Sequence, residues 1–184
     1  MLKRLVITGY KHNELGIFSE QNPAVGIIKK AIKKALIPLI EDGLEWILLS
    51  GQPGVELWAA EVVMELQGDY PDLKYAVIAP FLDQEKRWKE EKQEKYEEIL
   101  MMADFQASVT NRPYEGPWQY SAKNKFLIQH SDGLLILYDE DRPGSPKYMM
   151  DLARRYAEGH EYTIIPINFF DLQLIAEEEQ WKDW

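Results

Sequence analysis

The residues best suited to chemistry lie in the stretch SGQPGVE, residues 50–56, between an apolar run and a helical pattern. Gly51 and Gly54 permit tight backbone geometry, and Pro53 suits the first position of a helix. The free N–H groups at such a helix start can bind an anion. The stretch lacks the lysine of a P-loop and does not match G-x-G-x-x-G. Ligand binding and close strand–helix packing therefore both explain its glycines.

Glu56 falls in the first turn of the helix predicted after this stretch. Its charge can simply complement the helix dipole, which contributes about 0.3–1 kcal/mol. A carboxylate here would repel a phosphate, but it can accept hydrogen bonds from ribose hydroxyls. Catalysis as a general base is the third interpretation.

A second polar segment, TNRPYEGPWQYSAKNK, carries Arg112 and Tyr114 between prolines and glycines. Aromatic rings can stack on a base, and an arginine can pair with a phosphate through two hydrogen bonds. The alternative is that the aromatic side chains only hold the loop against the protein.

These residues must be positioned by alternating strands and helices. Near-continuous apolar runs predict strands at 4–8, 45–50, 75–79, 105–109, 133–138 and 163–167. Helical patterns predict helices at 24–41, 54–67, 84–103, 118–130, 145–158 and 172–179. Strands that read as apolar throughout are buried on both faces, as in a parallel sheet. We therefore predict an α/β fold: a Rossmann-like three-layer sandwich with a mainly parallel, about six-stranded sheet flanked by helices.

The composition of the chain limits the classes of function to expect. The 184 residues suit one domain, 1–184, with an acidic C-terminal tail at roughly 171–184. There is no cysteine and there are only three histidines, so we expect no metal site. A formal net charge of −10 argues against extended nucleic-acid binding. No signal peptide or membrane span is evident, and we expect a cytoplasmic protein with no membrane contact.

Several stretches together resemble one family. They are VITGYKHNELGIF, GLEWILLSGQPGVELWAAE, NRPYEGPWQY, KNKFLIQHSDGLLILYDED and GSPKYMMDLA. The chain resembles the YpsA family of small bacterial proteins, also called DUF1273 or UPF0398. That family falls in the SLOG superfamily with DprA and the LOG-type phosphoribohydrolases.

The resemblance implies a Rossmann-like fold that binds a nucleotide or a nucleotide-derived ligand such as NAD or ADP-ribose. The positions that it implies are Thr8, Gly9, Tyr10, Ser50, Gly51, Gln52, Gly54, Glu56, Gly144 and Ser145. LOG-type enzymes carry P-G-G-x-G-T-x-x-E, whereas DRPGSPKYMMD has one glycine, with Lys147 and Tyr148 in the region of the glutamate. The resemblance therefore does not carry phosphoribohydrolase activity over to this chain.

Three hypotheses remain open. The first, which we favour, is a sensing or regulatory domain that binds a nucleotide-derived small molecule and signals to a protein partner. The second is a hydrolase of a glycosidic or phosphate bond in a nucleotide, with Glu56 as the candidate catalytic residue. The third is a protein-interaction module with a degenerate pocket.

Overall fold

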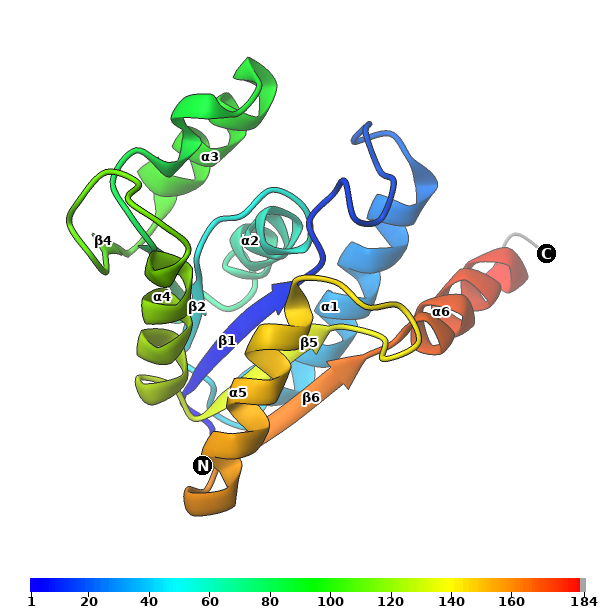
Figure 1. Ribbon diagram of the computed structural model, residues 1–184. Helices are drawn as coiled ribbons and strands as arrows, with labels where there is room; N and C mark the ends of the chain where they lie inside the picture. Colours follow the sequence, from blue (N-terminus) through cyan, green and yellow to red (C-terminus); the bar gives the residue numbers. More distant parts are fainter. Residues whose placement is uncertain (183–184) are drawn as a thin grey trace.

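The computed structural model describes residues 1–182 and contains one six-stranded sheet (Figure 1). All strand pairs are parallel, and the strand order is β4-β3-β2-β1-β5-β6. The strands are β1 (Arg4–Gly9), β2 (Trp46–Leu49), β3 (Lys74–Ala79), β4 (Phe105–Ser108), β5 (Gly133–Leu137) and β6 (Thr163–Ile167). The predicted α/β class and parallel sheet are confirmed.

Helices cover both faces of the sheet. They are α1 (Pro23–Glu41), α2 (Val55–Leu66), α3 (Glu90–Met102), α4 (Trp118–Gln129), α5 (Pro146–Gly159) and α6 (Phe169–Lys182). Helices α3, α2, α1 and α6 contact one another in turn, whereas α4 and α5 contact each other on the opposite face (Figure 1). This arrangement is the predicted three-layer sandwich.

The strand order reverses between β1 and β5. From β1 the chain builds outward through β2, β3 and β4, and then crosses to β5 on the other side of β1. The crossover places α1 and α4 on opposite faces of the sheet (Figure 1). At such a reversal of strand order, ligands typically bind beyond the carboxyl ends of the strands, here β1 and β5. The core of the central strands is fully apolar: Leu5, Val6 and Ile7 of β1 are at most 1% exposed. The rigid middle of the sheet therefore carries the loops at this edge.

The charged segment 84–103 differs from its predicted single helix. A 3₁₀ turn, η1 (Gln84–Arg87), precedes α3, and the extended backbone of Trp88 separates the two. Trp88 packs its ring against Tyr96 at 5.2 Å between centroids. Burying this aromatic pair outweighs the helical propensity of the surrounding charged residues.

The acidic C-terminal segment is a helix as far as the structure describes it. Helix α6 packs on α1 and buries Ile175. Its Glu178 and Glu179 pair with Lys34 and Lys30 of α1. Residues 183–184 of the predicted tail lie outside the described residues. Across residues 1–182, none of the helices combines the length and apolarity that crossing a membrane requires.

Candidate functional site

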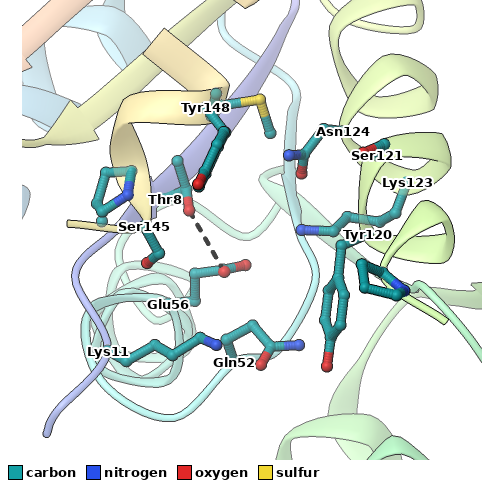
Figure 2. A pocket seen from close by; sticks show the side chains of 14 residues that line it. Thr8, Lys11, Gln52, Glu56, Tyr120, Ser121, Lys123, Asn124, Ser145 and Tyr148 are labelled. Atoms are coloured by element: carbon teal, nitrogen blue, oxygen red, sulfur yellow. Dashed lines mark hydrogen bonds between the residues drawn. The ribbon is translucent and has the colours of Figure 1, made fainter. Parts of the chain in front are cut away.

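A cavity of about 420 Å³ lies at the carboxyl edge of the sheet, at the point where the strand order reverses. Side chains from the ends of β1 and β2 meet side chains from α4 and α5 there (Figure 2). The lining residues are Thr8, Gly9, Lys11, Gln52, Glu56, Pro117, Tyr120, Ser121, Lys123, Asn124, Ser145, Pro146, Tyr148 and Met149. We call this cavity the central pocket.

Glu56 lies at the floor of the central pocket and is 4% exposed. Its Oε1 accepts the N–H of Ser50 at 2.6 Å and the Ser50 Oγ–H at 2.8 Å. Thr8 donates its hydroxyl to Oε2 at 3.3 Å. A carboxylate has about four lone-pair sites, so three donors leave room for one more hydrogen bond from the pocket.

Lys123 extends from α4 toward the same space as Glu56 (Figure 2). The residue is 7% exposed, and none of the hydrogen bonds that Glu56 accepts within residues 1–182 comes from it. Burial lowers the pKa of Lys123, the charge of Glu56 raises it, and the charge of Lys11 lowers it further. Because the net shift is downward, the loss of hydration outweighs the attraction of Glu56. The pocket thus holds a lysine that is largely withdrawn from water and lies near the charge of Glu56 without donating to it.

Lys11 supplies a second cation at the pocket. Its Nζ lies 5.8 Å from the centre of the Tyr120 ring, so the side chain reaches from the loop after β1 toward α4. Lys11 and Lys123 outnumber the single lining carboxylate of Glu56. In a chain with a net charge of −10, this pocket is locally positive.

Lys123 and Asn124 were not among the site residues predicted from the sequence, although the position of Lys123 in α4 indicates its burial. Gln119, Lys123 and Leu127 recur every four residues and are all buried. The inner stripe of α4 is therefore polar where it meets the carboxyl edge and apolar further along. In a sequence, polar residues that continue the apolar stripe of a helix indicate that this part of the helix lines a pocket.

The start of α2 is less open than the sequence suggested. The Val55 N–H donates to the carbonyl of Tyr10 at 3.1 Å, and the His12 N–H donates to the carbonyl of Pro53 at 3.3 Å. Gly54 has φ +118°, and a Cβ there would lie 2.5 Å from the His12 nitrogen. The loop after β1 covers this helix end, so close packing accounts for Gly54.

Other glycines of the predicted site have the same explanation. A Cβ on Gly9 would lie 2.7 Å from Val55, and a Cβ on Gly51, at φ +81°, would lie 2.5 Å from Tyr96. A Cβ on Gly144 would meet Glu14 at 2.5 Å. All three positions admit no side chain because protein atoms occupy the space.

The N-terminus of α5 is occupied by Glu14. This carboxylate accepts the N–H of Ser145 at 2.7 Å and its Oγ–H at 2.6 Å. It also accepts the N–H of Lys11 at 3.0 Å. Burial acts to raise the pKa of Glu14, but these hydrogen bonds lower it overall. Ser145 precedes α5 but does not cap the helix with its own hydroxyl, because that hydroxyl donates to Glu14.

The predicted site residues divide into three groups. Thr8, Gly9, Gln52, Glu56 and Ser145 line the central pocket. Tyr10, Ser50, Gly51, Gly54 and Gly144 lie behind it or beside it as structural supports. Arg112 and Tyr114 lie on the loop before α4, outside the central pocket.

Tyr10 and Arg112 lie outside the central pocket for different reasons. Tyr10 is 1% exposed and donates its hydroxyl to the carbonyl of Arg142 at 2.6 Å. Its ring stacks on Phe169. Arg112 points outward and pairs with Glu115 at 3.6 Å. Tyr10 therefore anchors the loop after β5, and Arg112 contributes no charge to the central pocket.

Comparison with known proteins places the chain in a family. The model described as the YspA SLOG family matches residues 5–172. The chain belongs to the YpsA family. A UPF0398 protein of Lysinibacillus sphaericus is 55% identical over 97% of this chain and 100% of its own length. UPF0398 proteins of Brevibacillus brevis and Bacillus cereus are each 54% identical, over 98% and 99% of this chain and 96% and 99% of their own lengths. The resemblance inferred from sequence stretches is confirmed.

The YpsA fold also resembles a solved structure of DNA processing protein A from Helicobacter pylori, whose description concerns its single-stranded DNA binding mode. The TM-score is 0.55 at 16% identity, over 100% of this chain and 82% of the other. This likeness corrects one expectation. From the net charge we expected no extended binding to nucleic acid. That expectation is contradicted, since a protein of similar fold binds single-stranded DNA. Whole-chain charge does not report the charge of a local groove.

Proposed function

We propose that the central pocket binds a nucleotide-derived ligand, with its ribose hydroxyls at Glu56 and its phosphate at Lys123. One relationship carries this proposal. Glu56 and Lys123 face the same space, yet Lys123 is not among the donors to Glu56 in the described chain (Figure 2). A ligand with both hydroxyl donors and an anionic group would satisfy the two side chains at once.

The remaining lining residues suit the same ligand. Lys11 adds a second positive charge, and Gln52, Ser121 and Asn124 add donors and acceptors around it. A cavity of about 420 Å³ falls within the range of small-molecule sites. NAD, ADP-ribose and AMP all combine ribose hydroxyls with phosphate, and each meets these requirements.

We assign the pocket a sensing or regulatory role rather than catalysis. Glu56 already accepts three hydrogen bonds and is fixed by the backbone of Ser50. Those donors hold the carboxylate in one position, where it can accept a further hydrogen bond from a ligand hydroxyl. A change in ligand occupancy would be relayed to a protein partner through the loops that close the pocket.

Thermal-shift measurements with AMP, ADP-ribose and NAD test this proposal. A ligand at a hundredfold excess over its Kd stabilises the folded state by about 2.7 kcal/mol. We expect at least one compound to raise the Tm of the wild-type protein and to lose this effect in Lys123→Met. The matched control is Lys125→Met, which removes an exposed lysine of the same helix. Stabilisation by none of the three compounds, or equal stabilisation of Lys123→Met, would contradict the proposal.

Single-stranded nucleic acid is a second candidate ligand. The exposed rings of Tyr114 and Trp118 favour it, because exposed aromatic side chains can stack on unpaired bases. The similarity in fold to a protein that binds single-stranded DNA also favours this candidate. Fluorescence anisotropy with labelled oligonucleotides over a salt series tests it. Affinity that falls steeply as salt increases is the expected signature, and no anisotropy change at low salt would exclude it.

A further inference from the structure

A second cavity of about 390 Å³ adjoins the central pocket and is rich in aromatic side chains. It lies between the loop after β3 and the loop before α4. Its lining residues are Phe81, Leu82, Asp83, Gln84, Lys86, Arg87, Trp88, Pro113, Tyr114 and Tyr120. We call it the aromatic pocket.

Three rings of the aromatic pocket form one cluster. Phe81 lies 5.0 Å from Tyr114 and 5.5 Å from Tyr120, measured between ring centroids. Phe81 is buried, whereas Tyr114 is 51% exposed. One ring thus supports the others from below while part of the Tyr114 surface stays open. Such a platform suits stacking with a flat aromatic group.

The walls of the aromatic pocket are held in place. The Leu82 N–H donates to the carbonyl of Arg112 at 2.8 Å, and Thr110 donates its hydroxyl to the carbonyl of Pro80 at 2.8 Å. Asp83 has φ +55° and Asn111 has φ +49°; within residues 1–182 they are the two non-glycine residues with positive φ. One belongs to each loop. Strained backbone that neighbouring contacts hold in place tends to gather at binding sites.

The two pockets are physically joined. Tyr120 lines both of them. Gln52 of the central pocket donates to Gln84 of the aromatic pocket at 2.6 Å. Gln84 in turn donates to the carbonyl of Ser50 at 2.7 Å, and Ser50 holds Glu56. A continuous polar chain therefore runs from the ribose-binding carboxylate proposed above to the aromatic pocket.

From this juxtaposition we infer that the aromatic pocket is the subsite for the heteroaromatic base of the ligand, which stacks on Tyr114 beside Lys86 and Arg87. This inference rests on the proposed function and specifies it, because the ribose phosphate would lie in the central pocket and the base next to it. The base belongs either to a free nucleotide or to a segment of single-stranded nucleic acid. Both sources present the same planar ring.

The test compares ligands with and without a base on matched variants. Calorimetric titration with AMP and with ribose 5-phosphate gives the contribution of the base as a ratio of affinities. Base–aromatic stacking predicts that wild-type protein binds AMP about 5- to 100-fold more tightly. In Tyr114→Ala the ratio of the two affinities should fall close to 1, whereas the affinity for ribose 5-phosphate should stay at the wild-type level. Tyr114→Phe, which keeps the ring, should retain the ratio, and so should Phe170→Ala, which removes an exposed ring of α6 outside both pockets.

The outcomes separate the inference from the proposed function. If ribose 5-phosphate binds and AMP binds no more tightly, the base subsite would be contradicted, but the proposed role of the central pocket would not. Equal losses for both ligands in Tyr114→Ala would overturn it too, since Tyr114 would then act through folding. Binding of neither ligand would overturn the proposed function. A short oligonucleotide that binds more tightly than AMP, and depends on Tyr114, would support the subsite with nucleic acid as the source of the base.

Discussion

Glu14 and Ser145 are separated by 131 positions in the chain, yet two hydrogen bonds of 2.6 and 2.7 Å join them. They tie the loop after β1 to the start of α5, across the point where the strand order reverses. The carboxylate satisfies a helix N-terminus that would otherwise attract an anionic ligand. An anion in the central pocket must therefore rely on the lysines.

Glu14→Gln should destabilise the protein by about 2 kcal/mol, because hydrogen bonds to a charged acceptor are lost. The pKa of Glu14 is lowered in the folded state from the ordinary value of 4.5. Its stabilisation is therefore complete above that value and is lost as the pH falls through the lower folded pKa. Urea unfolding at a series of pH values measures the difference. Glu97→Gln, at an exposed position of α3, is the control and should change little. A difference that persists undiminished at low pH would contradict the account.

Gly54→Ala should destabilise the folded protein by more than about 2 kcal/mol, since positive φ and a steric clash both oppose a side chain. The alanine Cβ would lie 2.5 Å from the His12 nitrogen and 2.7 Å from the Tyr10 oxygen. Gly26→Ala is the matched control, because it lies within α1 with no atom within 4 Å of the added Cβ. That change should stabilise by up to about 1 kcal/mol. If Gly54→Ala has the same free energy of unfolding as the wild type, close packing does not explain the glycine at this position.

Lys123→Met should make the ligand-free protein more stable, by about 1–3 kcal/mol, because it replaces a buried charge with an apolar chain. The pKa of Lys123 lies below its ordinary value of 10.5 in the folded protein. The cost of its charge is therefore fully present below the folded pKa and disappears as the pH rises toward the unfolded value. Accordingly, the advantage of Lys123→Met should shrink as the pH increases. Chemical unfolding between neutral and alkaline pH checks this, and an advantage that grows with pH would refute it.

Glu56→Gln should reduce discrimination between ribose and dideoxyribose. In the proposed complex the carboxylate accepts ligand hydroxyls, so wild-type protein should prefer AMP to 2′,3′-dideoxy-AMP by about tenfold. The variant should bind the two compounds with similar affinity. Competition binding measures both ratios. A preference that survives in Glu56→Gln would place the ribose elsewhere.

The central strands were predictable because burial on both faces leaves an unbroken apolar run, as in GLLIL of β5, whereas the edge strand β4, FQAS, is largely exposed. The alternation of strands and helices with right-handed crossovers predicts a parallel sheet whose ligand sites lie at the carboxyl edge, but it does not determine the strand order. Contacts between distant loops were not predictable. Nothing local to Gly54 reveals that the loop after β1 covers α2, and nothing local to Ser145 points to Glu14. Lys123 was overlooked because a lysine in a helix is usually exposed, and only its neighbours Gln119 and Leu127 reveal the buried stripe.

Calorimetric titration of AMP, ADP-ribose and NAD into wild-type protein and Lys123→Met tests the central claim most directly, with Lys125→Met alongside. We predict that at least one compound binds the wild type and Lys125→Met alike, and that Lys123→Met binds it at least about tenfold more weakly, as loss of a charge-assisted contact requires. Equal affinity of all three proteins, or no binding to any of them, would contradict the account.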